Sequence, residues 1–108
     1  MHATEIISRY ERILVVSAEM VVSAQESRWE DLLSLEIARR ELIQTATAEP
    51  ASRLDDVAFQ ARKETLIRAI LAADEQVKSL TLAWMSEMQG ILTSVQAERK
   101  LAVAYETG

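Results

Sequence analysis

A regular spacing of apolar side chains over residues 66–95 is the feature that most restricts the fold of this chain. An apolar residue returns at every third or fourth position, which winds one continuous stripe along a single helix face. The stripe consists of Leu66, Ile70, Ala73, Val77, Leu80, Trp84, Met88, Ile91 and Val95. A second apolar line flanks it at Ile67, Leu71, Met85 and Leu92. The spacing predicts a long amphipathic helix whose wide apolar face must be covered.

The scarcity of turn-forming residues extends this prediction to the whole chain. Only two glycines and one proline occur in 108 residues. Because these residues interrupt helices and start turns, their rarity predicts a mostly helical chain with short connections. The length fits one domain over residues 1–108, and an apolar content of 49% with 27% charged residues is typical of a globular protein.

The periodicity also sets the expected helix boundaries. The predicted helices span residues 4–24, 27–47, 53–92 and 95–105. Ser27 and Glu30 have the spacing of a capping box at the start of the second helix. Pro50 ends that helix because proline lacks an amide donor, and Thr93 with Ser94 forms a candidate hinge before the last helix. The expected fold is an all-α, antiparallel bundle of three main helices with a short fourth helix at the C-terminus.

The predicted helices differ in length. The first two have about 20 residues each, or about 30 Å, whereas the third is nearly twice as long. A hairpin of the first two helices then covers only part of the third. Apolar residues near its end remain to be covered, at Trp84, Met85, Met88, Ile91 and Leu92. Contiguous apolar patches usually mark interaction sites, so we expect the fourth helix, a second copy of the chain or a client protein to cover this one.

The sequence contains little that suggests catalysis or bound cofactors. His2 is the only histidine, there is no cysteine, and no residues have the spacing of metal ligands or of a glycine-rich phosphate loop. We therefore expect a protein that is not an enzyme and needs no cofactor or metal.

Charge and hydropathy narrow the possible partners and compartment. A net charge of −5 and a pI near 4.9 argue against direct nucleic-acid binding, which needs a clustered basic surface. No apolar run has the length of a membrane span, and residues 1–10 lack the pattern of a signal peptide. These features predict a cytoplasmic protein whose partners are proteins.

Four side chains allow two interpretations each. Trp29 is either a core residue that closes the first hairpin or a partner contact at the rim of a groove. Trp84 and Met88 are either core residues or part of an adaptable binding face. Glu36 lies on the apolar side of the second helix, where it forms a local ion pair with Arg39 or Arg40, or else faces a partner.

Four short segments resemble one known family. Residues 27–36 are similar to a W-x-x-L-x-x-x-E stretch of the FliT-type flagellar export chaperones, through Trp29, Leu32 and Glu36. Residues 66–80 resemble the ILxxDxxVxxL core of that family. Residues 85–88 and the ending Ala104-Tyr105 resemble two further elements, although Met88 replaces a leucine and Gly90 interrupts the third helix. The order and spacing of these segments extend the resemblance over almost the whole chain.

The resemblance implies a cytosolic chaperone for the protein that caps the flagellar filament. Such a chaperone holds the C-terminal amphipathic segment of its client and delivers it to the export ATPase and the export gate. Some members also bind the flagellar master transcription regulator and inhibit it. In this family the fourth helix covers a partner surface in the free protein.

Together these observations define a set of candidate binding residues. Capture of a helix in a groove is expected to use Leu35, Leu42, Ile67, Leu71, Val77, Lys78, Trp84 and Met88. A regulatory latch is expected at Leu101, Ala104 and Tyr105. Two other functions stay open: an anti-activator or other helical interaction module without a role in export, and a homodimeric structural bundle.

Overall fold

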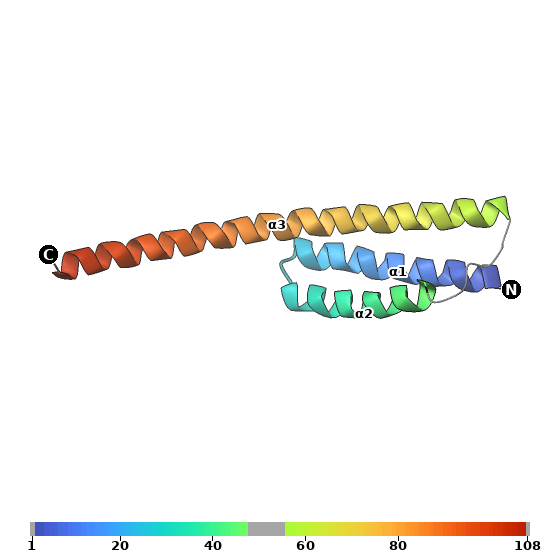
Figure 1. Cartoon of the computed structure of the whole chain (residues 1–108), viewed down its shortest axis with the longest axis horizontal. Coiled ribbons are helices and arrows are strands. Elements are labelled where there is room, and N and C mark those ends of the chain that lie inside the picture. Colours follow the sequence, from blue (N-terminus) through green and yellow to red (C-terminus); the bar gives the residue numbers. More distant parts are fainter. Residues whose placement is uncertain (1, 48–55, 108) are drawn as a thin grey trace. The chain divides into compact units, whose positions relative to one another are not determined.

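The computed structural model describes residues 2–47 and 56–107, and these are almost entirely helical. The described residues form three α-helices and no strand: α1 (His2–Gln25), α2 (Trp29–Thr47) and α3 (Val57–Thr107) (Figure 1). The all-α prediction is therefore confirmed. The helix-ending role predicted for Pro50 concerns a residue outside the described ranges. The chain divides into two compact units, residues 1–78 and 79–108, which are described separately.

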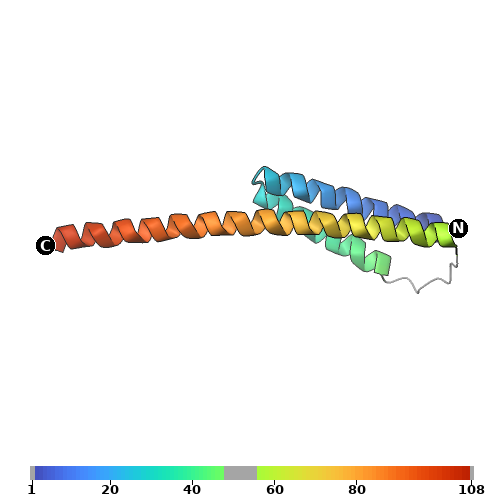
Figure 2. The same ribbon diagram turned by 90° about the horizontal axis from the view of Figure 1, so that it is seen from above.

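In the unit of residues 1–78, all three helices contribute to one hydrophobic core. Helices α1 and α2 pack side by side along their length, as two perpendicular views show (Figures 1 and 2). The buried apolar side chains are Ile13, Met20, Val21 and Ala24 from α1, Leu32 from α2, and Phe59, Leu66 and Ile70 from α3. Full burial of a large aliphatic side chain stabilises a fold by about 1.5–3 kcal/mol. Leu66 and Ile70, the first members of the predicted stripe, thus lie in the core.

A polar network crosses this core and joins the three helices. Ser17 is buried on α1, and its Oγ donates a hydrogen bond to the carbonyl oxygen of Ile13 (2.8 Å). The same Oγ accepts a hydrogen bond from Nη1 of Arg39 on α2 (3.2 Å). Arg39 also forms an ion pair with Asp74 on α3. The network satisfies the polar groups of Ser17 and Arg39 where they would otherwise face apolar side chains.

The ion pair predicted for Glu36 is confirmed with Arg40 as its partner. Arg40 Nη2 lies 3.4 Å from Glu36 Oε1, one helical turn away, and both side chains are exposed. Exposed pairs of this kind contribute less than about 1 kcal/mol. Arg39, the alternative partner, instead contacts Ser17 on α1 and Asp74 on α3 in the network described above.

The α1–α2 connection differs from the predicted capping box. Ser27 has a φ of 58°, in the left-handed region, and is not the N-cap of α2. The amide of Arg28 donates to the carbonyl of Ser23 (2.8 Å), and the amide of Ser27 donates to the carbonyl of Ala24 (3.2 Å). These two bonds form a Schellman motif that closes the end of α1. The carbonyl of Arg28 accepts the first bond of α2, from Leu32 (3.0 Å), so the helix starts one residue later than the capping box required.

We expect Ser27→Gly to stabilise the protein by about 0.5–1 kcal/mol. A side chain is strained at positive φ, whereas glycine adopts this conformation without steric cost. Urea denaturation followed by circular dichroism measures the change, and Ser34→Gly in the middle of α2 serves as the control, which should destabilise. A destabilising Ser27→Gly would contradict the left-handed assignment.

The predicted fourth helix is not a separate element. Residues 95–105 belong to α3, the same helix that contains residues 57–92 of the predicted third helix. The predicted hinge at Thr93 and Ser94 is therefore wrong. Thr93 Oγ1 donates to the carbonyl oxygen of Gln89 (2.9 Å), a bond that a hydroxyl can make within a helix. The segment that follows is rich in strong helix formers and contains neither glycine nor proline up to residue 107, so nothing local stops the helix.

Gly90 lies inside α3, and its replacement by alanine should strengthen the helix around it. A Cβ added at Gly90 meets nothing within 4 Å, so the substitution introduces no clash. Glycine costs about 0.8–1 kcal/mol relative to alanine within a helix. We expect Gly90→Ala to slow amide hydrogen exchange at residues 86–94 by several-fold, because about 0.8–1 kcal/mol changes the equilibrium for local opening by such a factor. Unchanged exchange would show that residues 86–94 are not helical in solution.

Candidate functional site

The unit of residues 1–78 contains a small apolar pocket that all three helices line. Its volume is about 240 Å³. Its lining residues are Tyr10 and Ile13 from α1, Ile43 and Ala46 from α2, and Ile67, Ile70 and Leu71 from α3. The only polar group among these side chains is the phenol of Tyr10. A pocket of this composition suits an apolar side chain rather than a charged or reactive ligand.

The depth of the pocket follows from the burial of its walls. Ile13 and Ile70 are buried core residues and form its deepest part, whereas Ile43 and Leu71 are exposed at its rim. Ile67 is half-buried between them. An exposed leucine and an exposed isoleucine beside a continuous apolar floor leave apolar surface in contact with water, at about 25 cal/mol per Å². Covering this surface with a partner side chain is therefore favourable.

Charged side chains on α3 hold the α1 wall of the pocket. The Lys63 ammonium lies 5.8 Å from the centre of the Tyr10 ring, within the range of a cation–π interaction. Arg62 Nη2 lies 3.7 Å from Glu11 Oε1, and both of these side chains are half-exposed. These contacts position Tyr10 at the pocket edge without closing the rim at Leu71.

The structure brings together two of the predicted binding residues and separates two others from them. Ile67 and Leu71 line the same pocket. Leu35 instead lines a groove of about 690 Å³ formed by α1 and α2, and Leu42 lines a smaller hollow of about 330 Å³ on those helices. Leu35 and Leu42 thus do not line the pocket that contains Ile67 and Leu71, and their role in partner binding stays a prediction.

Ile43 and Tyr10 belong to the pocket but were not singled out by the sequence pattern. Ile43 follows Leu42 directly, and a step of one residue turns a helix by about 100°, so neighbouring apolar residues serve different faces. Apolar residues occur on every side of α2, which hides the face that meets α3. Tyr10 lies on the apolar line of α1, where it reads as an ordinary core position.

The remaining predicted binding residues lie further along α3. Val77 is half-buried and Lys78 is exposed, at the end of the first unit. Trp84 and Met88 are half-buried in the unit of residues 79–108. Their role in partner binding stays a prediction. Trp29, at the start of α2, is also half-buried, so it is neither a fully buried core residue nor a fully exposed contact.

The described residues of the second unit, 79–107, are helical and carry many exposed apolar side chains. These are Leu82, Met85, Ile91, Leu92, Val95, Leu101, Val103 and Tyr105. Among the predicted latch residues, Leu101, Ala104 and Tyr105 are all exposed, and Tyr105 is 82% exposed. The latch role stays a prediction.

Two further features concern the chemistry open to the chain. Over residues 2–47 and 56–107, no group of three or more His, Cys, Asp or Glu side chains is placed to hold a metal ion. Within the same ranges, no helix has the length and hydropathy needed to cross a membrane. The pocket described above is an apolar recess, which recognises shape and apolar surface.

The fold and pocket thus define a small all-α protein with a surface suited to binding an apolar side chain. Comparison with known families then gives its membership: residues 7–107 match the family model described as flagellar protein FliT. The chain belongs to the FliT family. Because the match covers nearly the whole chain, it confirms the family resemblance found in the four short sequence segments.

Three curated relatives carry the name flagellar protein FliT. The protein of Photorhabdus laumondii is 21% identical over 101 residues, which cover 94% of this chain and 81% of the relative. The protein of Serratia proteamaculans is 25% identical over 88 residues, or 82% and 72% of the two chains. That of Yersinia enterocolitica is 28% identical over 95 residues, or 85% and 79%. The chain is thus a flagellar protein whose sequence has diverged far from these relatives.

Proposed function

We propose that this chain is a chaperone for flagellar export that binds the C-terminal amphipathic segment of the filament-cap protein, its client. Membership of the FliT family supports a flagellar role. The observation that carries the binding proposal is the apolar pocket with Ile67 and Leu71 in its wall. In this proposal the chain delivers its client to the export ATPase and the export gate.

The proposed binding mode places a client helix over the apolar pocket, along α3. One apolar client side chain enters the pocket beside Ile43 and Leu71. Ile67, Leu71 and Lys78 follow one another at spacings of four and seven residues, so they share one face of α3. Lys78 is then placed to pair with an acidic client residue about two turns beyond the pocket. The mode requires the three helices of residues 1–78 to pack as an antiparallel bundle, which is part of the proposal.

The proposal extends to the latch residues Leu101, Ala104 and Tyr105. A latch must leave the helical path of α3 and cover the client surface, so a client displaces it only by binding the open form better. Truncation after Ser94 should then tighten client binding about fivefold or more, the usual size of a coupling between two sites. Fluorescence anisotropy with a labelled client segment measures the affinity. Weaker binding by a truncated chain whose remaining residues stay folded would show that residues 95–107 contact the client instead.

Co-purification tests the proposed function most simply. The chain and the filament-cap protein of the same organism, mixed as purified proteins, should elute together in size-exclusion chromatography. A cap protein that lacks its C-terminal segment should elute separately. Co-elution that does not depend on this segment would contradict the proposed binding mode, and the absence of any complex would contradict the proposed client.

A further inference from the structure

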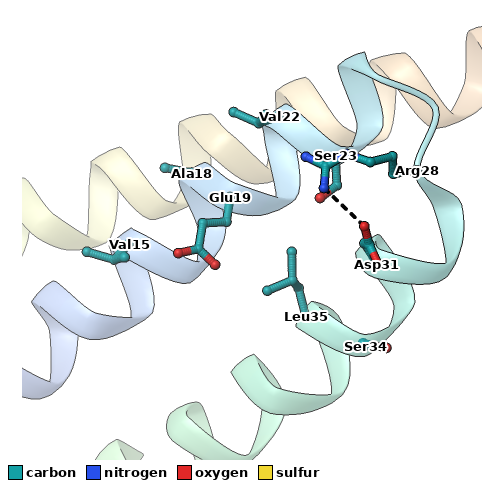
Figure 3. Close-up of a pocket in the computed structure, with 9 residues that line it drawn as sticks. All are labelled: Val15, Ala18, Glu19, Val22, Ser23, Arg28, Asp31, Ser34 and Leu35. Atoms are coloured by element: carbon teal, nitrogen blue, oxygen red, sulfur yellow. Dashed lines mark hydrogen bonds and ion pairs between the residues drawn. The ribbon is translucent and has the colours of Figure 1, made fainter.

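The α1–α2 pair carries a second groove whose lining shares no residue with the apolar pocket. Its volume is about 690 Å³. Figure 3 draws the residues that line it: Val15, Ala18, Glu19, Val22 and Ser23 from α1, with Arg28, Asp31, Ser34 and Leu35. Val15 is two positions from the core residue Ile13, so the helix turns it by about 200° to the opposite side. The groove therefore belongs to a different face of the protein.

This groove continues along α1 into the smaller hollow that Leu42 lines. Val15 belongs to both, and the hollow also includes Ser8, Glu11, Arg12 and Val16. From Ser8 to Ser23 the two together follow α1 over about 22 Å, or about four helical turns. This length suits a docked helix better than a single side chain.

The floor and walls of the groove are apolar. Val15 is 57% exposed and Val22 is 43% exposed. The two valines lie on the same face of α1, about two turns apart. Leu35 points from α2 into the space between the helices (Figure 3). A helix that places aliphatic side chains against Val15, Val22 and Leu35 would cover surface that is now in contact with water.

Within the 690 Å³ groove, Glu19 is the charged lining residue that lacks a counterion among the described residues, and Arg12 in the adjoining hollow likewise forms no ion pair with any of them. Arg28 is paired with Glu26 (2.8 Å) and with Asp31 (3.0 Å), which neutralises that end of the groove. The carboxylate of Glu19 points into the space between α1 and α2 (Figure 3), and it forms no ion pair with any described residue. An unpaired carboxylate between exposed valines favours a partner that brings a positive charge to this point.

We propose that the α1–α2 groove binds an amphipathic helix of another protein that carries a basic residue on its apolar face, opposite Glu19. The helix would place two aliphatic side chains against Val15 and Val22, and a lysine or arginine between them would pair with Glu19. Because the groove and the apolar pocket have no residue in common, the chain can hold this helix and a client segment at the same time.

A designed peptide of about 15 residues, which matches the groove length, is a direct probe. It carries leucines on one face and a lysine between them, and a twin peptide carries glutamate in place of that lysine. We expect the lysine peptide to bind and to shift the methyl NMR signals of Val15, Val22 and Leu35, and the glutamate twin to bind at least about tenfold more weakly. Binding that shifts only signals of Ile67 and Leu71, or no saturable binding by the lysine peptide, would overturn the proposal.

Charge reversal at Glu19 makes the test independent of the peptide design. Glu19→Lys should weaken binding of the lysine peptide and strengthen binding of the glutamate twin, each about tenfold. Glu75→Lys makes the same change in net charge on an exposed residue of α3, and it should leave the preference unchanged. Equal effects of both substitutions would show that binding depends only on the net charge of the chain, and this would overturn the proposal. A dimer of the free chain that Glu19→Lys dissociates would also overturn it, because a second copy would then occupy the groove.

Discussion

Leu71→Asp should weaken binding of the C-terminal segment of the cap protein about 100-fold or more. Leu71 is 57% exposed at the rim of the apolar pocket, so an aspartate there can keep its carboxylate hydrated in the free chain. In the complex the carboxylate would face an apolar client side chain without a counterion, which is costly. Residues in the centre of an interface commonly contribute 2 kcal/mol or more, and about 1.4 kcal/mol corresponds to tenfold in affinity. Isothermal titration calorimetry with the purified segment measures the loss.

Leu33→Asp is the matched control for this substitution. Leu33 is a 59% exposed leucine on α2 and lines neither the pocket nor the grooves. It should bind the client segment within about twofold of the parent chain, because surface substitutions away from a site rarely change free energies by more than ~0.5 kcal/mol. Equal losses of affinity for Leu71→Asp and Leu33→Asp would show that the pocket does not take part in client binding.

Asp74→Ala should destabilise the protein by about 1–3 kcal/mol. Arg39 has a side chain only 15% exposed and spans from Ser17 to Asp74, so loss of the carboxylate leaves a mostly buried guanidinium with a hydroxyl as its remaining partner. Removing one member of a buried pair can cost 3–5 kcal/mol, and the 38% exposure of Asp74 reduces this figure through solvent screening. Thermal and urea denaturation measure the change.

A double-mutant cycle separates loss of the pair from loss of packing. The cycle consists of Arg39→Met, Asp74→Ala and the double substitution. The double substitution removes both charges and should recover most of the stability that Asp74→Ala loses, because no charge is then left unpaired. Glu64→Ala, which breaks the exposed Arg68–Glu64 pair (2.6 Å), should cost less than about 0.5 kcal/mol. Strictly additive effects at Arg39 and Asp74 would show that the two side chains do not interact in solution.

The helical content and the core face of α3 could be predicted from the sequence. Leu66 and Ile70 head the apolar stripe, and both are buried. This success has a physical cause: at the spacing of a helix, apolar residues three and four positions apart must fall on one face, whatever packs against them.

The ends of the helices were less predictable, because they depend on local backbone geometry. Ser27 has the sequence signature of an N-cap, yet its φ of 58° places it in the Schellman motif that ends α1. Thr93 and Ser94 suggest a helix end in the sequence, but the hydroxyl of Thr93 donates a hydrogen bond to the carbonyl oxygen of Gln89 within α3. In both cases the side chain has two hydrogen-bonding choices, and the sequence does not say which one the backbone takes.

Of the residues that line the pocket, the sequence singled out Ile67 and Leu71 on α3 but none on α2. Leu33, Leu35, Ile37 and Ile43 point to several sides of this helix, so no single apolar face stands out. Ile67 and Leu71 were recognisable because α3 has one clear stripe and one flanking line. The α2 residues of the pocket, Ile43 and Ala46, became visible only in the structure, and binding by Leu42 stays a prediction.

The most direct test of client binding is a titration of methyl-labelled chain with the C-terminal segment of the cap protein, followed by NMR. We predict saturable binding in which the signals of Ile43, Ile67 and Leu71 shift most, while those of Val22 and Leu33 stay in place. Absence of saturable binding would contradict the proposed client. Saturable binding with the largest shifts outside the pocket, at Val22 or in residues 79–107 alone, would contradict the proposed site.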